Sequence, residues 1–283
     1  MEKIWLQSYP KGVPAEIDID HIPSLVALFE KACQTYADKV AYISMGREIT
    51  YRQLDVEARE FAGWLQSKGM QKGDRVALMM PNILQYPVAL FGTLRAGCVV
   101  VNCNPLYTPR ELEHQLKDSG AKAIVIVENF AHTLQQVISH TAVKHVVVTS
   151  MGEKLGGLKG AIVNFVVRRV KKMVPAWHLP GAISFKTALA QGRKSGFKTV
   201  ALTQGDLAFL QYTGGTTGVS KGAMLTHANI ASNVTQAYSW IKPVVREGEE
   251  MIITALPLYH VFALTANCLT FLMIGARNLL IAN

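Results

Sequence analysis

The sequence has 283 residues, of which 49% are hydrophobic and 17% charged, and its formal net charge is +9. These proportions fit a folded protein that can bury a substantial core, and they exclude a disordered chain. The four cysteines form no CxxC pair and no metal-type spacing, and the first residues lack the apolar run of a secretory signal. We therefore expect a cytoplasmic protein whose cysteines are reduced and mostly buried.

Hydrophobic periodicity predicts alternating helices and strands up to residue 150. Helices are expected over residues 23–38, 51–69, 82–95, 109–120 and 130–138. Strands are expected over residues 39–44, 75–80, 98–103, 122–127 and 144–150. Short, nearly all-apolar strands that alternate with helices predict an α/β fold whose sheet is covered on both faces.

Residues 151–205 interrupt this alternation and carry most of the positive charge. From Lys154 to Gly205 the chain has ten Lys or Arg and no Asp or Glu. Further elements are then expected as strands over 207–212, 223–225, 250–256 and 277–283, and as helices from about 226 and over 261–274. We divide the chain into an N-terminal α/β subdomain, 1–205, and the start of a second subdomain, 206–283. Because a strand reaches the last residue, we expect the front part of a longer protein.

The loop 212–222, "YTGGTTGVSKG", combines three kinds of phosphate-binding group. Its glycines let backbone N–H groups converge on an anion, its threonines add hydroxyl donors, and its lysine adds a charge on a flexible stem. These residues are Gly214, Gly215, Gly218, Thr213, Thr216, Thr217 and Lys221. The loop is not the P-loop of NTPases, because Val219 and Ser220 separate the last glycine from the lysine. A plain turn between two strands is the alternative.

The segment from Tyr212 to Gly222 resembles the phosphate-binding signature of the acyl-adenylate-forming enzymes. It departs from the signature at Gly215, where many members have Ser, and at Ser220, where many have Pro. A second segment, "ALPLYHVFAL" (255–264), resembles the next motif of that superfamily, in which an aromatic–histidine pair lies beside the carboxylate site. This resemblance favours a site role for His260 over the alternative of a buried core histidine.

Longer stretches narrow the resemblance to the bacterial long-chain fatty-acid–CoA ligases. They include "KGDRVALMMPNILQYPVALFGTLRAG" and "NPLYTPRELEHQLKDSGAKAIVIVENFAHTL", and the resemblance runs from residue 1 to residue 283. It implies the N-terminal part of the large domain of an adenylate-forming enzyme, with mixed sheets covered by helices and the C-terminal part absent. The later motifs of the superfamily, which contact adenine and ribose and supply a catalytic lysine, do not occur in this sequence.

The resemblance also implies an activity. A fatty carboxylate would react with ATP, bound with Mg²⁺, to give acyl-adenylate, and the acyl group would then pass to coenzyme A. The residues implied to bind the ATP phosphates are Tyr212, Thr213, Gly214, Gly215, Thr216, Thr217, Gly218, Lys221 and Gly222. Lys221 and His260 are implied in catalysis, His260 in the region of the carboxylate and α-phosphate, and no residue is assigned as a general base or metal ligand.

Because half of such an enzyme is expected to be missing, we expect weak activity or none from 283 residues. The alternative is a non-catalytic remnant or binding subunit that retains a nucleotide- or acyl-binding scaffold. A homodimer is among the partners that the resemblance allows. Nucleic-acid binding is not favoured, since valines rather than stacking aromatics interleave the basic residues of the chain.

The stretch "GAIVNFVVRRVKKMVPAW" (160–177) predicts a basic amphipathic helix. In helical projection valines and Trp177 fall on one face, and Arg168, Arg169, Lys171 and Lys172 fall on the other. This pattern is typical of a segment lying on an anionic membrane surface, here the inner face of the cell membrane. An ordinary surface helix packed on the core is the alternative. The apolar stretch 256–276 is interpreted as a buried helix rather than a membrane span.

Overall fold

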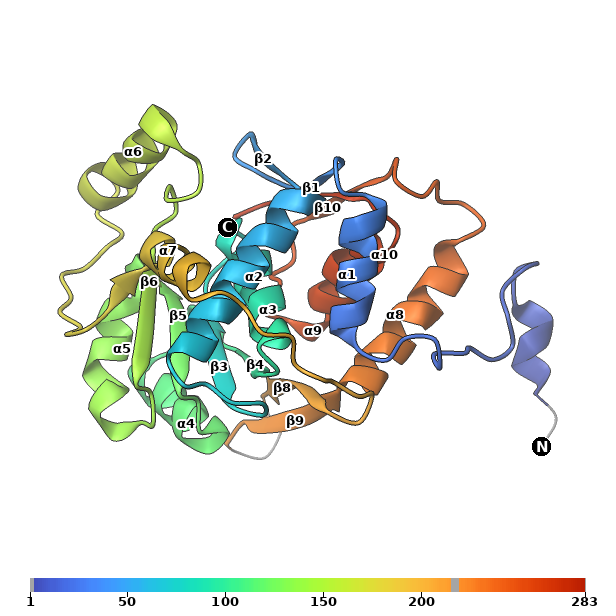
Figure 1. Ribbon diagram of the computed structural model, residues 1–283, viewed down its shortest axis with the longest axis horizontal. Coiled ribbons are helices and arrows are strands. Elements are labelled where there is room, and N and C mark those ends of the chain that lie inside the picture. The colour runs from blue at the N-terminus through green and yellow to red at the C-terminus, as the bar shows by residue number, and fades with distance from the viewer. Residues whose placement is uncertain (1–2, 215–218, 283) are drawn as a thin grey trace.

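A seven-stranded sheet forms the centre of the larger part of the chain (Figure 1). The computed structural model describes residues 3–214 and 219–282. The strands run in the order β7-β6-β5-β3-β4-β8-β9 and are parallel except for the antiparallel pair β8–β9. Their bounds are β3 Arg75–Met79, β4 Val99–Asn102, β5 Ala123–Val127, β6 His145–Thr149, β7 Ile183–Ser184, β8 Leu207–Thr213 and β9 Lys221–Thr226.

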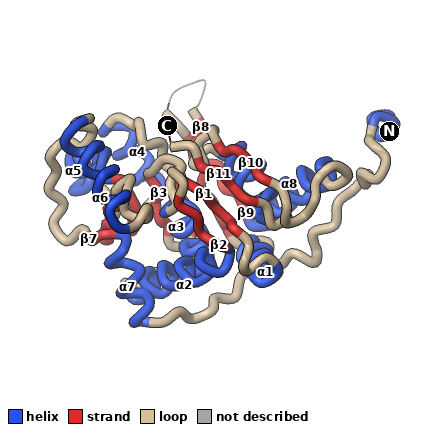
Figure 2. The backbone as a smooth tube through the Cα atoms, turned by 90° about the horizontal axis from the view of Figure 1, so that it is seen from above, coloured by secondary structure: helices blue, strands red, loops and turns tan. Residues whose placement is uncertain are grey.

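Helices cover both faces of this sheet, as predicted (Figure 2). Alternate residues of each strand point to opposite faces, so that Val76 and Leu78 of β3 enter one hydrophobic cluster while Ala77 and Met79 enter the other. The helices are α1 Leu25–Thr35, α2 Tyr51–Ser67, α3 Gln85–Arg95, α4 Pro109–Ser119, α5 Ala131–Val137, α6 Gly157–Phe165, α7 Phe185–Ser195 and α8 His227–Ile241. Helices α2, α3 and α7 pack together on one face, and α4 and α5 lie on the other.

A second, four-stranded sheet joins the beginning of the chain to its last described strand. Its order is β10-β11-β1-β2, and β1 pairs in parallel with β11. The strands are β1 Val40–Ser44, β2 Arg47–Thr50, β10 Met251–Thr254 and β11 Arg277–Leu280. The proposed division at residue 205 stays a prediction, and strands from both sides of it pair in both sheets, as β8 does with β4.

Local sequence signals define most helix starts. Ser24, Thr50, Thr108 and Thr226 each accept a hydrogen bond from a backbone N–H in the first turn of α1, α2, α4 and α8. In three of these four cases a Gln, Glu or Asn three residues later completes a capping box. Pro109 begins α4 and Gly120, with φ of +62°, follows its end, as predicted. The four cysteines are free and buried, which confirms that prediction.

The structure corrects two predicted helices. The predicted helix over 160–177 is wrong beyond Val170: α6 continues through a π-helical turn, Val166–Val170, and then ends. Lys172 has a φ of +51°, which a helix cannot accommodate, and Pro175 lacks the N–H that a continuing helix needs. The predicted helix over 261–274 is confirmed as a continuous helical segment, but its centre, Leu264–Thr270, is π-helical and lies between α9 Val261–Ala263 and α10 Phe271–Met273.

Helix α7 was not predicted, because the basic charge of its surroundings obscured its pattern. It packs closely against α2, where a Cβ atom on Gly192 would lie 1.7 Å from the carbonyl oxygen of Glu60. The glycine is therefore required by the distance between the two helices. Over residues 3–214 and 219–282, no helix is long and apolar enough to cross a membrane.

His227, at the first position of α8, is buried and ties α8 to the start of α1. Its Nδ1 accepts a hydrogen bond from the Leu25 N–H at 3.1 Å. Burial lowers the pKa of the ring to about 4, and the nearby Lys72 charge acts in the same direction. The folded protein therefore requires the neutral imidazole.

We predict that His227 makes stability depend on pH. In the unfolded chain the ring takes up a proton near its ordinary pKa of 6.5, whereas in the folded protein it does so only near pH 4. This contribution is present above pH 6.5 and is lost as the pH falls towards 4. Between pH 7 and pH 5 it should cost about 2 kcal/mol of unfolding free energy. His227→Asn, which keeps an acceptor, should flatten the dependence in urea titrations; an unchanged slope would contradict the assignment.

Candidate functional site

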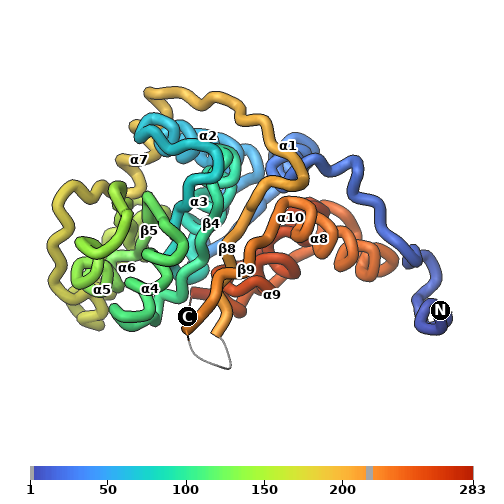
Figure 3. Tube along the Cα trace, turned by 90° about the horizontal axis from the view of Figure 1, so that it is seen from below, coloured from blue at the N-terminus to red at the C-terminus, as the bar shows by residue number. Residues whose placement is uncertain are grey.

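The loop 212–222, called the glycine–threonine loop from here on, connects the neighbouring strands β8 and β9 at one end of the seven-stranded sheet (Figure 3). Strand β8 enters the loop at Thr213 and β9 leaves it from Lys221, and these two residues are paired. Thr213, Gly214 and Lys221 are exposed to solvent. The other predicted phosphate-binding residues, Gly215, Thr216, Thr217 and Gly218, lie outside the described part of the chain.

The base of the loop is closely packed around Tyr212. Its ring is buried and lies against Gly222, the paired residue on β9, where a Cβ atom would come within 2.9 Å of the ring. The Tyr212 hydroxyl donates a hydrogen bond to Oδ2 of Asp118 at 2.5 Å. Burial raises the pKa of Tyr212 well above 10, and the Asp118 carboxylate raises it further. Gly222 is therefore needed for packing as well as for the loop.

Helix α4 is hydrogen-bonded to the chain on both sides of the loop, which are called its rims below. Asp118 binds Tyr212 on the incoming strand, and His114, one turn earlier, donates from Nε2 to the carbonyl oxygen of Ser220 at 2.9 Å, just before the outgoing strand. The two side chains are four residues apart, so they lie on the same side of the helix. Neither residue was identified from the sequence, because their roles depend on how α4 packs beside β8 and β9.

His260 lies in the loop that follows β10 and directly precedes α9. The side chain is exposed, and its Nδ1 accepts a hydrogen bond from the Phe262 N–H at 3.4 Å. His260 is therefore not the buried core histidine that the sequence left open as the alternative. The ring caps a short helix and is accessible to a ligand, and its catalytic role stays a prediction.

Buried amide side chains connect these parts of the site. Asn102, the last residue of β4, donates from Nδ2 to Oε1 of Gln211 on β8 at 3.2 Å. Gln211 in turn donates to the carbonyl oxygen of Tyr259, beside His260, at 2.9 Å. Neither amide was predicted from the sequence, although each is a polar residue in an otherwise apolar strand, "VVVN" and "LAFLQYT". That interruption is the signal that could have revealed them.

The site lies where parallel strands end. Asn82 follows β3, Asn102 ends β4 and Thr213 ends β8, so all three lie at the carboxyl edge of the sheet. In open α/β sheets ligands bind outside this edge, between neighbouring strands. Among residues 3–214 and 219–282 no group of three or more His, Cys, Asp or Glu side chains could hold a metal ion.

The predicted membrane-facing residues are placed differently from one another. Arg168 forms an ion pair with the buried carboxylate of Glu128, with both Glu128 oxygens within 3.0 Å of its Nε. Trp177 is half-buried and packs against the core. Arg169, Lys171 and Lys172 are exposed. The structure therefore separates two residues that attach this segment to the body from three that face solvent.

Comparison with known proteins agrees with this fold. The family model described as AMP-binding enzyme matches residues 29–283. Long-chain-fatty-acid–CoA ligases from Yersinia pestis and Salmonella typhimurium are each 58% identical over 284 residues, covering all of this chain and 50% and 51% of those proteins. The crystal structure of a long-chain-fatty-acid-CoA ligase from Archaeoglobus fulgidus superposes with a TM-score of 0.76 at 23% identity. The superposition covers 97% of this chain and 50% of the Archaeoglobus chain.

The fold is that of an adenylate-forming enzyme. The chain belongs to the AMP-binding enzyme family. Both the α/β fold class and the resemblance to the bacterial long-chain fatty-acid–CoA ligases are thereby confirmed. The chain spans about half the length of the curated relatives it matches.

We predict that Gly222→Ala displaces Tyr212 and destabilises the protein by about 1–3 kcal/mol through overpacking. Gly214→Ala is the matched control, because a Cβ atom there meets no atom within 4 Å. Tyr212→Phe should cost about 1.5–3 kcal/mol, since it removes a hydrogen bond to a carboxylate. The double variant should lose less than the sum, because both changes disturb one contact. Urea denaturation measures all four; strict additivity would contradict a shared contact.

Proposed function

We propose that the protein activates long-chain fatty acids with ATP and passes the acyl group to coenzyme A, as a fatty-acid–CoA ligase or the N-terminal half of one. The observation that carries this proposal is the arrangement of the exposed loop end, Lys221 and His260 at the carboxyl edge of a sheet typical of the AMP-binding enzyme family. The names of its close relatives supply the substrate class.

The proposed chemistry requires charge neutralisation and positioning rather than a protein nucleophile, because a carboxylate is already nucleophilic. Backbone N–H groups of the loop and the Lys221 ammonium would hold the β- and γ-phosphates, so that negative charge on the departing pyrophosphate is stabilised. His260 would lie near the carboxylate and the α-phosphorus and orient them. Mg²⁺ enters as part of the MgATP substrate, and no residue of this chain is assigned to it.

A non-catalytic scaffold that binds nucleotide or acyl chain remains the alternative function. It predicts ATP binding without product, which separates it from the ligase by experiment. A cytoplasmic location, a homodimer and the absence of nucleic-acid binding stay predictions of the sequence analysis.

We predict that Lys221→Ala weakens ATP binding by roughly 10- to 100-fold, because a charge-assisted contact to phosphate is lost. Lys144→Ala is the control and should bind ATP normally. It removes an exposed lysine at the amino end of β6, on the edge of the sheet opposite the site. Equilibrium dialysis with labelled ATP measures binding, and coenzyme A thioester formation from MgATP and oleate measures turnover. Turnover that is lost in Lys221→Ala supports the ligase, and binding without turnover supports the scaffold. Absence of ATP binding by the wild-type chain would contradict the ligase and a nucleotide-binding scaffold alike.

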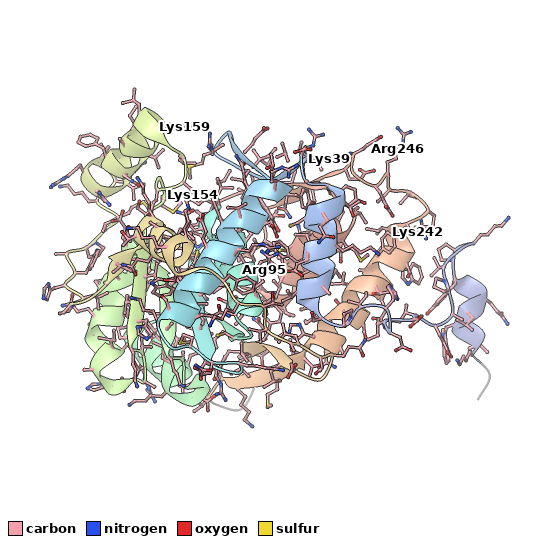
Figure 4. All side chains as sticks on the ribbon, in the orientation of Figure 1. Lys39, Arg95, Lys154, Lys159, Lys242 and Arg246 are labelled. Carbon is pink, nitrogen blue, oxygen red and sulfur yellow. The ribbon has the colours of Figure 1, made fainter. Side chains whose placement is uncertain are left out.

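We also propose that residues 157–177, the α6 segment, attach the protein peripherally to an anionic membrane surface. Helix α6 projects from the body at the upper left of Figure 1, and Figure 4 shows Lys159 on it. Five apolar side chains of this segment are more than half exposed: Leu158, Ile162, Phe165, Val170 and Met173. The surrounding cations, with no Asp or Glu between residues 154 and 205, match the charge of acidic lipids.

Of the exposed apolar side chains, Val170 and Met173 belong to the face expected from the sequence, whereas Leu158, Ile162 and Phe165 do not. Val163, Val166, Val167 and Val174 are half-buried, and Trp177 packs on the core. The Glu128–Arg168 ion pair explains the difference, since it turns the Arg168 side of the helix toward the body. Arg169, Lys171 and Lys172 remain available for lipid headgroups.

We predict that replacing Arg169, Lys171 and Lys172 by Gln weakens binding to phosphatidylglycerol vesicles roughly 100-fold, at about 1 kcal/mol for each charge near the surface. Leu158→Ser with Phe165→Ser should also release the protein by removing the inserted side chains. Val244→Ser, at an apolar residue that is 82% exposed elsewhere on the protein, is the control. Vesicle flotation at low and high salt measures the effect. Equal binding by all variants would exclude this surface.

A further inference from the structure

The amides Asn102 and Gln211 lie deep in the protein, 3% and 6% exposed. All the polar atoms of their two side chains have protein partners. Asn102 Oδ1 accepts from the Tyr86 hydroxyl at 2.8 Å, and its Nδ2 donates to Gln211 Oε1 at 3.2 Å. Gln211 Nε2 donates to the Tyr259 carbonyl at 2.9 Å. Two buried amides in apolar strands are costly unless such bonds form, so their geometry is well determined.

The far end of this network holds the backbone just before His260. The single Tyr86 hydroxyl proton is shared between Asn102 Oδ1 and the Leu258 carbonyl, each 2.8 Å from the hydroxyl oxygen. Asn82 Oδ1 accepts from the Leu258 N–H at 2.8 Å, and Asn82 Nδ2 donates to the carbonyl oxygens of Thr254 and Leu256. Gln211 of β8, Tyr86 of α3 and Asn82, which follows β3, therefore bind backbone groups of four residues in this segment: Thr254, Leu256, Leu258 and Tyr259.

The near end of the network reaches the glycine–threonine loop. Gln211 directly precedes Tyr212, whose ring and hydroxyl form the base of the loop. Helix α4, which holds both rims of the loop, also donates from Gln115 Nε2 to the Asn102 carbonyl at 2.8 Å. One connected set of buried hydrogen bonds thus links the loop to the segment that carries His260.

We propose that the Asn102–Gln211 amide pair is a positioning device that sets the place of the His260 segment relative to the phosphate-binding loop. Its significance for catalysis rests on the proposed function, because the two linked parts are those expected to bind carboxylate and phosphate. An apolar side chain at 211 could fill the same space but could not bind the Tyr259 carbonyl. Because amides do not titrate near neutral pH, the link is the same across that range.

The first test needs no ligand. Gln211→Met keeps the size of the side chain and removes both hydrogen bonds. Amide hydrogen exchange can be followed by NMR at Leu258 and His260, whose N–H groups are hydrogen-bonded in this segment. Exchange at these two amides should become roughly tenfold faster or more, and exchange in β5 should stay unchanged. Tyr86→Phe breaks the same network at another point and should give the same local result, so the test does not depend on one variant folding well.

Gln85→Met is the matched control for these variants. Gln85 is as buried as Gln211 and likewise makes two hydrogen bonds, here donating both, to Thr149 and Ser150 at the end of β6, which β5, β3 and β4 separate from β8. Exchange at Leu258 and His260 should not change in this variant. Unchanged exchange at these two amides in both Gln211→Met and Tyr86→Phe would overturn the proposal. An equal increase throughout β5 would also overturn it, because the amides would then act only on global stability.

The second test adds ATP. In the wild type ATP should slow exchange at Leu258 and His260, whereas Gln211→Met should bind ATP with similar affinity and not transmit this slowing. A purely structural role for Gln211 would leave the transmitted effect in place, and that result would overturn the proposal. If ATP does not bind the wild-type chain, the proposed function fails, and the ligand-free comparison still decides whether the amide pair positions the segment.

Discussion

The pairing of β8 between β4 and β9 is the constraint on which the site depends. Parallel pairing with β4 buries Phe209 and Leu210 in the two cores and places Gln211 beside Asn102. Antiparallel pairing with β9 places Tyr212 opposite Gly222 and returns the chain at Lys221. Since consecutive residues of a strand face opposite sides, Gln211 and Tyr212 serve two different neighbours. The former is linked to the His260 segment and the latter to α4.

The ion pair between Arg168 and the buried Glu128 carboxylate decides the orientation of the basic segment in a similar way. Glu128, next to the end of β5, is buried and pairs with the Arg168 guanidinium, because an unpaired buried carboxylate would be costly. One arginine of a run of cations is thus structural, and the remaining cations face solvent. The apolar edge of α6 is exposed as a result, which a count of charges along the chain does not reveal.

Short-range signals explain why so much of the secondary structure was predictable. Capping residues such as Thr50 and Thr108 bond to N–H groups only three residues away, and β-strands such as "AIVIV" are apolar on both faces because helices cover both. Predictions failed at α7, whose pattern the surrounding basic charge obscured although Ser184 caps its first turn. They also failed at the end of α6, where the backbone at Lys172 stops the helix.

The sequence by itself determined the α/β class, the order of most elements, the glycine–threonine loop and its lysine, because each of these is expressed within a few consecutive residues. Only the tertiary structure decided which residues meet across the sheet. It brought His114 and Asp118 to the rims of the loop and joined Asn102 to Gln211, 109 residues apart in the chain. It also placed β1 beside β11. Contacts at such separations are set by strand order and register, and no local pattern encodes them.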